Sequence, residues 1–148
     1  MRKSVLLTLL IALFSVSAAW AEFNPKPDKS YALKVKDTNP PLYLDVLTGV
    51  DNPHEDGTQR NISLSSAPCA IYFEMNDQWT CFIKNAKGEY VNNLQTSWNP
   101  EIVGTTKDWN GYWFFNQDGS GYITFNSWNS TYIHGDLAIG SPLYCGNA

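Results

Sequence analysis

The chain has 148 residues, with 10 Lys or Arg against 14 Asp or Glu and a formal net charge of −4. A chain of this length predicts one domain with a single core. Proteins that bind nucleic acids or anionic membrane surfaces use clustered Lys and Arg, and the sequence has no such cluster, so its charge argues against both partners.

Residues 1–21 have the pattern of a secretory signal peptide. Two basic residues at positions 2–3 precede an apolar stretch at 5–16, and the Ala-Trp-Ala triplet at 19–21 supplies a cleavage site. The apolar stretch is too short to span a bilayer comfortably, and polar sequence follows it at once, which disfavours a retained N-terminal anchor. We therefore expect cleavage after residue 21, a secreted or periplasmic location, and a mature chain of 127 residues with no membrane span.

Short β-strands are predicted along the rest of the chain. Runs of β-branched and aromatic residues alternate with clusters of Gly, Asn, Asp and Pro, and no long window has helical periodicity. Residues 22–30, with two prolines, are predicted to be an extended lead-in. Strands are expected near 31–36, 42–47, 61–66, 70–75, 79–84, 89–92, 101–105, 112–116, 121–126, 131–134 and 142–145. Many short strands with regular turns are typical of an all-β barrel or sandwich.

The predicted turns differ in length and in chemistry. Segments 85–88 and 117–121 contain the Asn, Asp and Gly residues that tolerate positive φ in a tight hairpin. Segment 48–60 is the longest predicted loop and is polar and charged. Because functional residues are concentrated on loops, this segment is a candidate for a functional loop.

Three cysteines follow the predicted cleavage site: Cys69, Cys81 and Cys145. Export to an oxidising compartment would allow one disulfide and leave one cysteine over. If residues 70–84 form a hairpin, Cys81 would lie opposite Tyr72, which places it about 10 Å from Cys69, too far for an undistorted bridge. The pairing therefore stays open at this stage.

A repeated pattern divides the chain into three parts. Each part has a strand, a polar turn, and a second strand that opens with tyrosine and an aliphatic residue. These second strands begin at Tyr43, Tyr90 and Tyr132, at spacings of 47 and 42 residues. Spacings of this size are typical of a repeated supersecondary unit, here of about four strands.

On these residues the chain resembles the β-trefoil family, which includes ricin-type and fascin-like carbohydrate- or protein-binding modules. The strand Tyr43-Leu-Asp-Val46 is similar to the family's strand with a sugar-binding aspartate, and the segment from Ile83 to Tyr90 is similar to its hairpin. The resemblance covers residues 31–146. It implies one all-β domain at 31–148, built as a six-stranded barrel capped by three hairpins; the alternative is another small β-barrel.

Two features depart from the family pattern. The Gln-x-Trp signature of the ricin-type members is absent, because the corresponding positions read Ala70-Ile71-Tyr72 and Gly111-Tyr112-Trp113. The third unit is also short, since only 16 residues follow Tyr132. A closing strand must then lie within residues 142–147 or be missing.

The sequence shows no catalytic or metal-binding constellation. The two histidines, His54 and His134, are not part of a nucleophile motif and have no cysteine at metal-ligand spacing. Acid pairs for glycoside hydrolysis could be drawn from four carboxylates, but nothing fixes their separation: Asp45, Glu74, Glu89 and Asp108. We therefore expect a protein that is not an enzyme and needs no cofactor.

Binding of a glycan is the first hypothesis, because tryptophan is followed by asparagine in three predicted turns. A sugar has apolar C–H faces and polar edges, which suit an aromatic ring beside an amide. The resemblance adds Asp45 and its counterparts in the other two repeats. The candidate binding residues are Asp45, Asn92, Trp98, Asn99, Trp109, Asn110, Trp128, Asn129 and His134. The other interpretation is that the three tryptophans close one end of the barrel as core residues.

The second hypothesis is a secreted protein-binding module, such as a proteinase inhibitor or an effector. The trefoil scaffold also resembles that of Kunitz-type inhibitors, and segment 48–60 would then be the contact loop. Such inhibitors usually pin this loop with disulfides, and segment 48–60 contains no cysteine. Asn61 and Asn129 each begin a glycosylation sequon, which matters only in a eukaryotic host.

Overall fold

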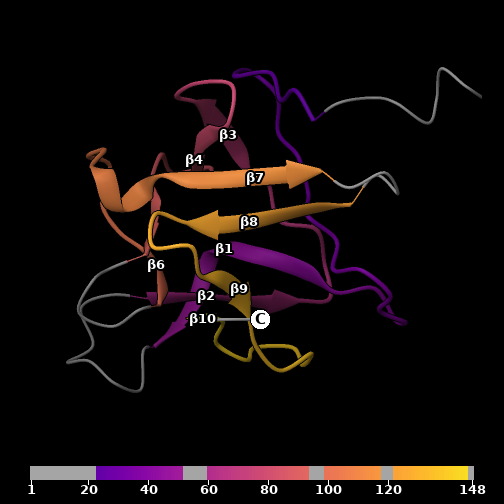
Figure 1. Cartoon of the computed structure of the whole chain (residues 1–148). Coiled ribbons are helices and arrows are strands. Elements are labelled where there is room, and N and C mark those ends of the chain that lie inside the picture. Colours follow the sequence, from indigo (N-terminus) through magenta and orange to yellow (C-terminus); the bar gives the residue numbers. More distant parts are fainter. Residues whose placement is uncertain (1–22, 52–59, 94–98, 118–121, 147–148) are drawn as a thin grey trace, which may run out of the picture.

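The computed structural model describes residues 23–51, 60–93, 99–117 and 122–146 (Figure 1). The predicted signal peptide lies outside these residues. Within them the chain is all-β, as predicted, with a single short 3-10 helix. The elements are β1 (Tyr43–Asp51), β2 (Arg60–Ser65), β3 (Tyr72–Met75), β4 (Thr80–Lys84), β5 (Val91–Asn93), β6 (Pro100–Ile102), η1 (Trp109–Gly111), β7 (Trp113–Gln117), β8 (Ile123–Ser127), β9 (Tyr132–His134) and β10 (Tyr144–Gly146).

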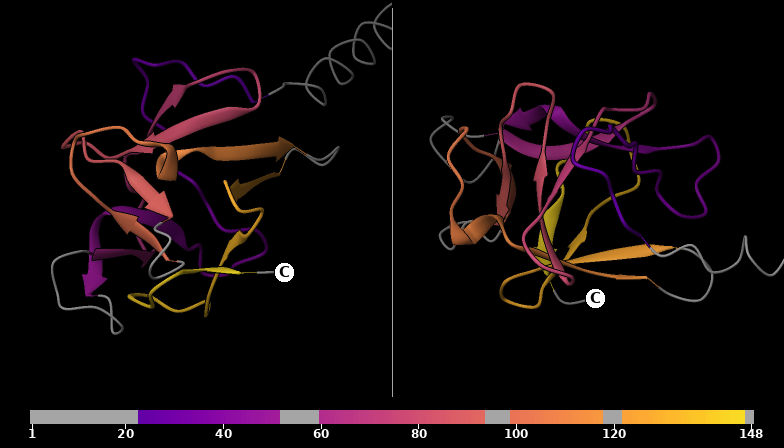
Figure 2. Two further views of the ribbon diagram at one scale, coloured as in Figure 1. Left: turned by 60° about the vertical axis from the view of Figure 1, so that its left-hand side comes forward. Right: turned by 90° about the horizontal axis from the view of Figure 1, so that it is seen from above.

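The strands form two antiparallel sheets. One has four strands in the order β1-β2-β6-β5, and the other has six in the order β10-β9-β8-β7-β4-β3. Figure 2 shows β7 and β8 on one side of the molecule and β1 with β2 on the other. The described strands do not close into a barrel, because each sheet ends in two edge strands. No helix within the described ranges is both long and apolar enough to cross a membrane.

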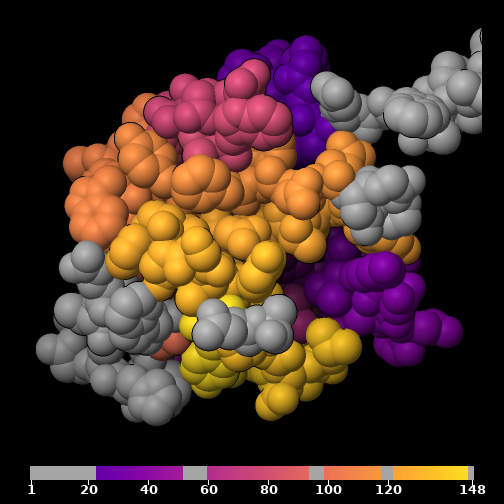
Figure 3. Space-filling model, in the orientation of Figure 1, coloured from indigo at the N-terminus to yellow at the C-terminus, as the bar shows by residue number. Residues whose placement is uncertain are grey.

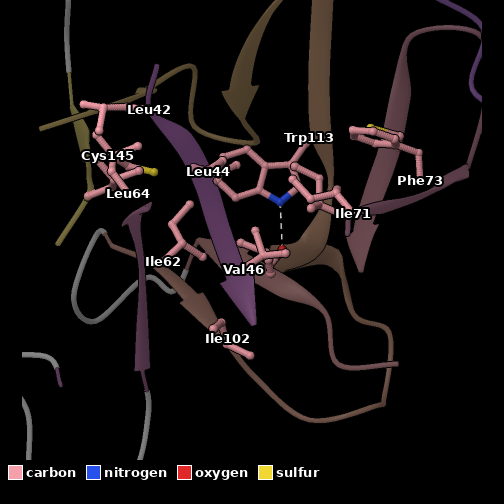
Figure 4. Packing of buried hydrophobic residues seen from close by; sticks show 14 residues of the cluster. Leu42, Leu44, Val46, Ile62, Leu64, Ile71, Phe73, Ile102, Trp113 and Cys145 are labelled. Atoms are coloured by element: carbon pink, nitrogen blue, oxygen red, sulfur yellow. Dashed lines mark hydrogen bonds between the residues drawn. The ribbon is translucent and has the colours of Figure 1, made fainter. Parts of the chain in front are cut away.

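The core contains side chains from both sheets and is centred on Trp113 (Figure 4). Alternate residues of a strand point to the same face, so Leu44 and Val46 of β1 reach the core together with Ile62 and Leu64 of β2. Trp113 is fully buried, and its indole Nε1 donates a hydrogen bond to the carbonyl oxygen of Val91 at 2.7 Å. This bond satisfies the polar atom that burial of a tryptophan would otherwise leave without a partner.

The predicted lead-in packs against the core. The ring of Phe23 lies edge-on to the rings of Phe73, Phe115 and Phe125, with centroids 5.1, 5.2 and 6.1 Å apart. Its backbone N–H also donates to Oε1 of Gln117 at 2.7 Å. The first described residue of the chain is therefore held by both packing and hydrogen bonding.

The prediction of a regular strand at 31–36 is wrong. Only two isolated bridges form, Tyr31 with Ile71 and Lys34 with Tyr43. The segment changes partners along its length: Tyr31 exchanges backbone hydrogen bonds with Ile71, and Val35 then donates to Leu42. A segment that divides its bonds between two partners does not build a continuous ladder.

The predicted loop at 48–60 begins too early, because β1 continues to Asp51. A bulge lies between Asp45 and Val50, and Gly49 there has a φ of 61°. Arg60 Nη1 donates to the carbonyl oxygens of Leu47 and Thr48 at 2.8 and 2.9 Å, which lets the strand cross the bulge. Residues 52–59 of the predicted loop lie outside the described ranges.

The predicted hairpin at 70–84 forms, but its register differs from the expected one. Cys81 lies opposite Met75 and not opposite Tyr72. Oδ1 of Asp77 accepts the N–H groups of Trp79 and Thr80 at 2.7 and 2.8 Å, and this turn sets the register.

None of the three cysteines is bonded to another; Cys69, Cys81 and Cys145 are free thiols. Burial raises the pKa of the Cys81 and Cys145 thiols to about 12.

The other predicted strands begin within two residues of the observed ones, although that at 101–105 ends three residues early, at Ile102. The segment predicted at 142–145 becomes β10, which pairs with β9. It completes a hairpin with β9. Just before it, Pro142 bridges Ser63 and the N–H of Leu143 donates to the carbonyl oxygen of Ile62 at 3.0 Å, so this segment also contacts β2 of the other sheet. The turn predicted at 117–121 lies largely outside the described residues.

Candidate functional site

Strand β5 holds three tryptophan-bearing segments in succession. The carbonyl oxygen of Val91 accepts from the indole of Trp113 in the core. Nδ2 of Asn92 donates to Oδ1 of Asp108 at 3.1 Å, just before Trp109. The carbonyl oxygen of Asn93 accepts from Nε1 of Trp128 at 2.9 Å. Three consecutive residues therefore fix the positions of η1, of the start of β7 and of the turn after β8.

Asp108 is the N-cap of η1. Its Oδ1 also accepts the backbone N–H of Asn110 at 2.8 Å, which is the usual role of an aspartate at this position. Both of these bonds end on Oδ1, and Oδ2 accepts no bond from the described residues. Because Asp108 is exposed, Oδ2 is available to a donor from outside the protein.

Gly111 allows the close approach of η1 to β5. A Cβ atom at this position would lie 2.7 Å from Oδ1 of Asn92 and 3.2 Å from Cδ1 of Phe82. Neither neighbour can move easily, since Asn92 and Phe82 are both buried. The glycine is therefore needed to bring Asp108 and Trp109 against Asn92.

Lys107 ties the segment before η1 to β3. Its ammonium pairs with Glu74, whose Oε2 also accepts the hydroxyl of Tyr90 at 3.0 Å and lies 3.8 Å from Nζ of Lys84. The hydrogen bond from Lys107 holds the pKa of Glu74 below its ordinary value. The ammonium of Lys107 is therefore paired with a carboxylate of β3.

Trp109 and Trp128 form an edge-to-face pair. Their ring centroids are 4.9 Å apart and the ring planes make an angle of 69°. Trp109 remains 48% exposed, whereas Trp128 is half-buried and its indole N–H is bonded to Asn93. Trp128 therefore supports Trp109, which presents an aromatic surface to solvent.

The turn after β8 is held by the side chain of Asn129. Its Oδ1 accepts from the hydroxyl of Ser127, from Oγ1 of Thr131 at 2.6 Å and from Nδ2 of Asn93 at 3.3 Å. Nδ2 of Asn129 donates to none of the described residues. Since Asn129 is half-buried, this amide is the second polar group that can meet a ligand beside the tryptophan pair.

A row of buried polar residues lies behind this surface. In the four-stranded sheet Glu101 of β6 pairs with Asn61 of β2 on one side and with Asn92 of β5 on the other. All three are 1% exposed or less, and Asn93 is fully buried beside them. The side-chain amide of Asn92 that positions Asp108 and the backbone carbonyl of Asn93 that positions Trp128 are therefore fixed within the sheet.

Five of the nine predicted site residues come together at this place, and three others, Asp45, Asn99 and His134, have different surroundings. The five are Asn92, Trp109, Asn110, Trp128 and Asn129. Asn99 is 3% exposed and therefore lies in the interior. His134 is an exposed residue of β9, paired with Tyr144 of β10. Trp98 lies outside the described residues.

Asp45 has a local structural role. Its Oδ1 accepts the backbone N–H groups of Leu47 and Thr48, each at 2.9 Å, and so stabilises the bulge in β1. These contacts stay within its own strand and do not reach Trp109. The family resemblance assigned a sugar-binding aspartate to this position. In the structure the carboxylate of Asp45 accepts hydrogen bonds from the backbone of its own strand.

Three residues of the site were not predicted from the sequence: Asp108, Asn93 and Ser127. Asp108 had a usable signal, because an aspartate directly before a Trp-Asn turn is a candidate N-cap. Asn93 and Ser127 had none, since they contact each other across 34 residues, with Nδ2 of Asn93 2.8 Å from Oγ of Ser127. The sequon at Asn61 is fully buried in the folded chain, and Asn129 is engaged in its turn.

The site has the groups for hydrogen bonding and stacking. No group of three or more His, Cys, Asp or Glu residues in the described ranges could hold a metal ion. No protein-family model and no curated protein matches the chain.

Proposed function

We propose that this protein binds a glycan noncovalently, without catalysis, on the exposed face of Trp109. The observation that carries the proposal is a half-exposed indole held edge-to-face by Trp128, directly after the exposed Asp108, whose Oδ2 accepts no bond from the described residues. The C–H face of a pyranose stacks on such a ring, while Asp108 accepts from a sugar hydroxyl and Asn129 donates to one. A ring that is already fixed loses little conformational freedom when the sugar binds.

We further propose a β-trefoil scaffold for this site and export through the predicted signal peptide. Three hairpins, β1–β2, β5–β6 and β9–β10, recur along the chain and support a threefold plan. Between them β3, β4, β7 and β8 pair in succession, as barrel strands of a trefoil would. Tyr31 bridges Ile71, next to β3, and would begin a fifth barrel strand.

The protein-binding alternative stays a prediction. Its proposed contact loop is centred on residues 52–59, outside the described ranges. The contacts of Trp109 favour the glycan hypothesis, because they pair an aromatic face with a carboxylate and an amide.

The test is binding of the mature protein, residues 22–148, to an array of glycans, followed by titration of any hit with tryptophan fluorescence. Trp109→Ala should weaken binding by about 2 kcal/mol, roughly thirtyfold in Kd, as expected for loss of a central aromatic contact. Trp79→Ala is the matched control, since its ring is 63% exposed but lies in the turn between β3 and β4. This control should bind like the wild type.

Two results would contradict the proposal. One is the absence of any glycan that binds the folded protein. The other is a glycan that binds Trp109→Ala and the wild type equally well. Circular dichroism on both variants checks that the fold is retained in each comparison.

A further inference from the structure

Strands β7, β8 and β9 carry no charged residue on their outer face. At the edge of this face the ammonium of Lys36 lies 4.5 Å from the ring centroid of Tyr122, directly before β8. These strands contain no Asp, Glu, Lys or Arg, and their outward positions carry aromatic, amide, hydroxyl and imidazole groups. The outward residues are Phe114, Asn116, Thr124, Asn126, Tyr132 and His134. Figure 3 views the molecule from this side, with β7 and β8 at the front. Protein surfaces normally mix charges of both signs, so a face without any is a distinct feature.

Three of these residues form one row across the sheet. Phe114 pairs with Asn126, and Asn126 pairs with Tyr132. The two aromatic side chains are 45% and 38% exposed, and they flank the amide of Asn126. Neighbouring strands are about 4.8 Å apart, so the two aromatic residues are separated by roughly 10 Å. We call Phe114, Asn126 and Tyr132 the aromatic strip.

The aromatic strip is continuous with the candidate site. Phe114 and Asn126 are each one position further along the β7–β8 ladder than the pair Trp113 and Ser127. Trp128 follows Ser127 directly, and η1 with Trp109 ends two residues before β7 begins. In Figure 1 η1 and the turn between β8 and β9 lie at the same end of the sheet. A ligand on Trp109 that extends along the sheet would therefore reach the strip.

We propose that the aromatic strip is an additional binding surface for a neutral, linear oligosaccharide whose first unit stacks on Trp109. The inference rests on the proposed function and specifies its ligand: a chain of several uncharged sugars and not a single terminal residue. Phe114 and Tyr132 each stack on a sugar face, and the amide of Asn126 bonds a hydroxyl between them. None of the three strands carries a Lys or Arg to pair with sulfated, sialylated or uronic acid chains, and the ammonium of Lys36 is already placed over the ring of Tyr122.

The experiment measures Kd for neutral β-1,4-linked glucose and N-acetylglucosamine chains, from the monosaccharide to the hexasaccharide, by calorimetry. The wild type should bind the longer chains more tightly. Phe114→Thr and Tyr132→Thr should each weaken binding of the longest chain by roughly 3- to 10-fold and leave the shortest bound ligand unaffected. Threonine keeps β-propensity on an exposed strand face, so both variants should fold. Leu137→Ala serves as the control, since this side chain is 65% exposed and lies after β9, outside the strip.

The outcomes separate this inference from the proposed function. If Trp109→Ala abolishes binding but affinity does not rise with chain length, the glycan site stands and the strip is overturned. The strip is also overturned if Phe114→Thr binds every chain like the wild type, or if it instead converts a dimer to a monomer in light scattering, which would make the face a contact between copies. If no chain from either series and no array glycan binds, both proposals fail.

Discussion

The two sheets of this protein treat asparagine and aromatic residues in opposite ways. In the four-stranded sheet Asn61, Asn92 and Asn93 are buried almost completely. At the β7–β9 end of the six-stranded sheet Phe114 and Tyr132 lie on the outside. Asparagine is mostly exposed in proteins and phenylalanine mostly buried, so both regions depart from the usual preference.

The difference shows which departures a fold can explain by itself. The buried amides have partners: Asn93 bonds Ser127 and Asn129, and Asn92 bonds Asp108. Burial of a polar group is tolerated where such bonds form, so the fold accounts for the donating side of these amides. Their Oδ1 atoms, and that of Asn61, have no partner in the described part of the chain. The outward side chains of Phe114 and Tyr132 stay 45% and 38% exposed, although aromatic residues are usually covered. Exposed aromatic residues that lie together are explained better by a ligand than by stability.

The comparison predicts that replacing tryptophan by phenylalanine costs much more stability at Trp113 than at Trp109. Trp113→Phe should lower the free energy of unfolding by about 3 kcal/mol, because it removes buried volume and leaves the carbonyl oxygen of Val91 without its partner. Trp109→Phe should change it by less than about 0.5 kcal/mol, because the ring is half-exposed. Urea denaturation of both variants measures the difference.

Equal losses at the two positions would break the comparison. Such a result would mean that Trp109 is part of the core and that the interpretation of the tryptophans as core residues is correct. It would also weaken the glycan proposal independently of any binding measurement.

A smaller effect is expected from asparagine substitutions in the two sheets. Asn93→Ala should cost about 2 kcal/mol, because Ser127 and Asn129 lose a partner inside the protein. Asn116→Ala, at an exposed position on β7, should cost less than about 0.5 kcal/mol. Thermal unfolding of both variants is sufficient to rank them. If Asn93→Ala unfolded at the same temperature as the wild type, the buried amides would not be needed for the stability of the sheet.

Much of the fold could be predicted from the sequence, because alternation and turn residues are local signals. The all-β class and the starts of most strands follow from them. The bulge in β1 could not be predicted, since it depends on Arg60 crossing to Leu47 and Thr48. The register of the β3–β4 hairpin depends on which N–H groups Asp77 accepts, and the pattern of apolar residues does not encode that choice.

The candidate site was predicted in part, because some of its residues also have a local signal in the sequence. Trp109 and Trp128 were identified because each is followed by asparagine in a predicted turn. Their pairing could not be, since it requires Asn92 and Asn93 to hold two distant segments. The three Trp-Asn turns look equivalent in the sequence, but Asn99 is an interior residue and Asn110 is a half-buried residue of η1. Only burial separates them.

The smallest predicted effect concerns the charged end of the six-stranded sheet, which contrasts with the uncharged end at β7–β9. Lys107 holds the pKa of Glu74 below its ordinary value of 4.5, so the unfolded chain binds the proton more readily than the folded one. The stabilisation is then present above pH 4.5 and is lost as the pH falls through the lower, folded pKa. Glu74→Gln should flatten the fall in stability over this acid range, measured as Tm against pH. Some slope should remain, because hydrogen bonds from Trp79 and Thr80 also lower the pKa of Asp77. If the profile of Glu74→Gln were unchanged, the ion pair with Lys107 would contribute nothing to stability in solution, as is common for exposed pairs. The position of η1 would then depend on the bond from Asn92 and on the close approach that Gly111 allows.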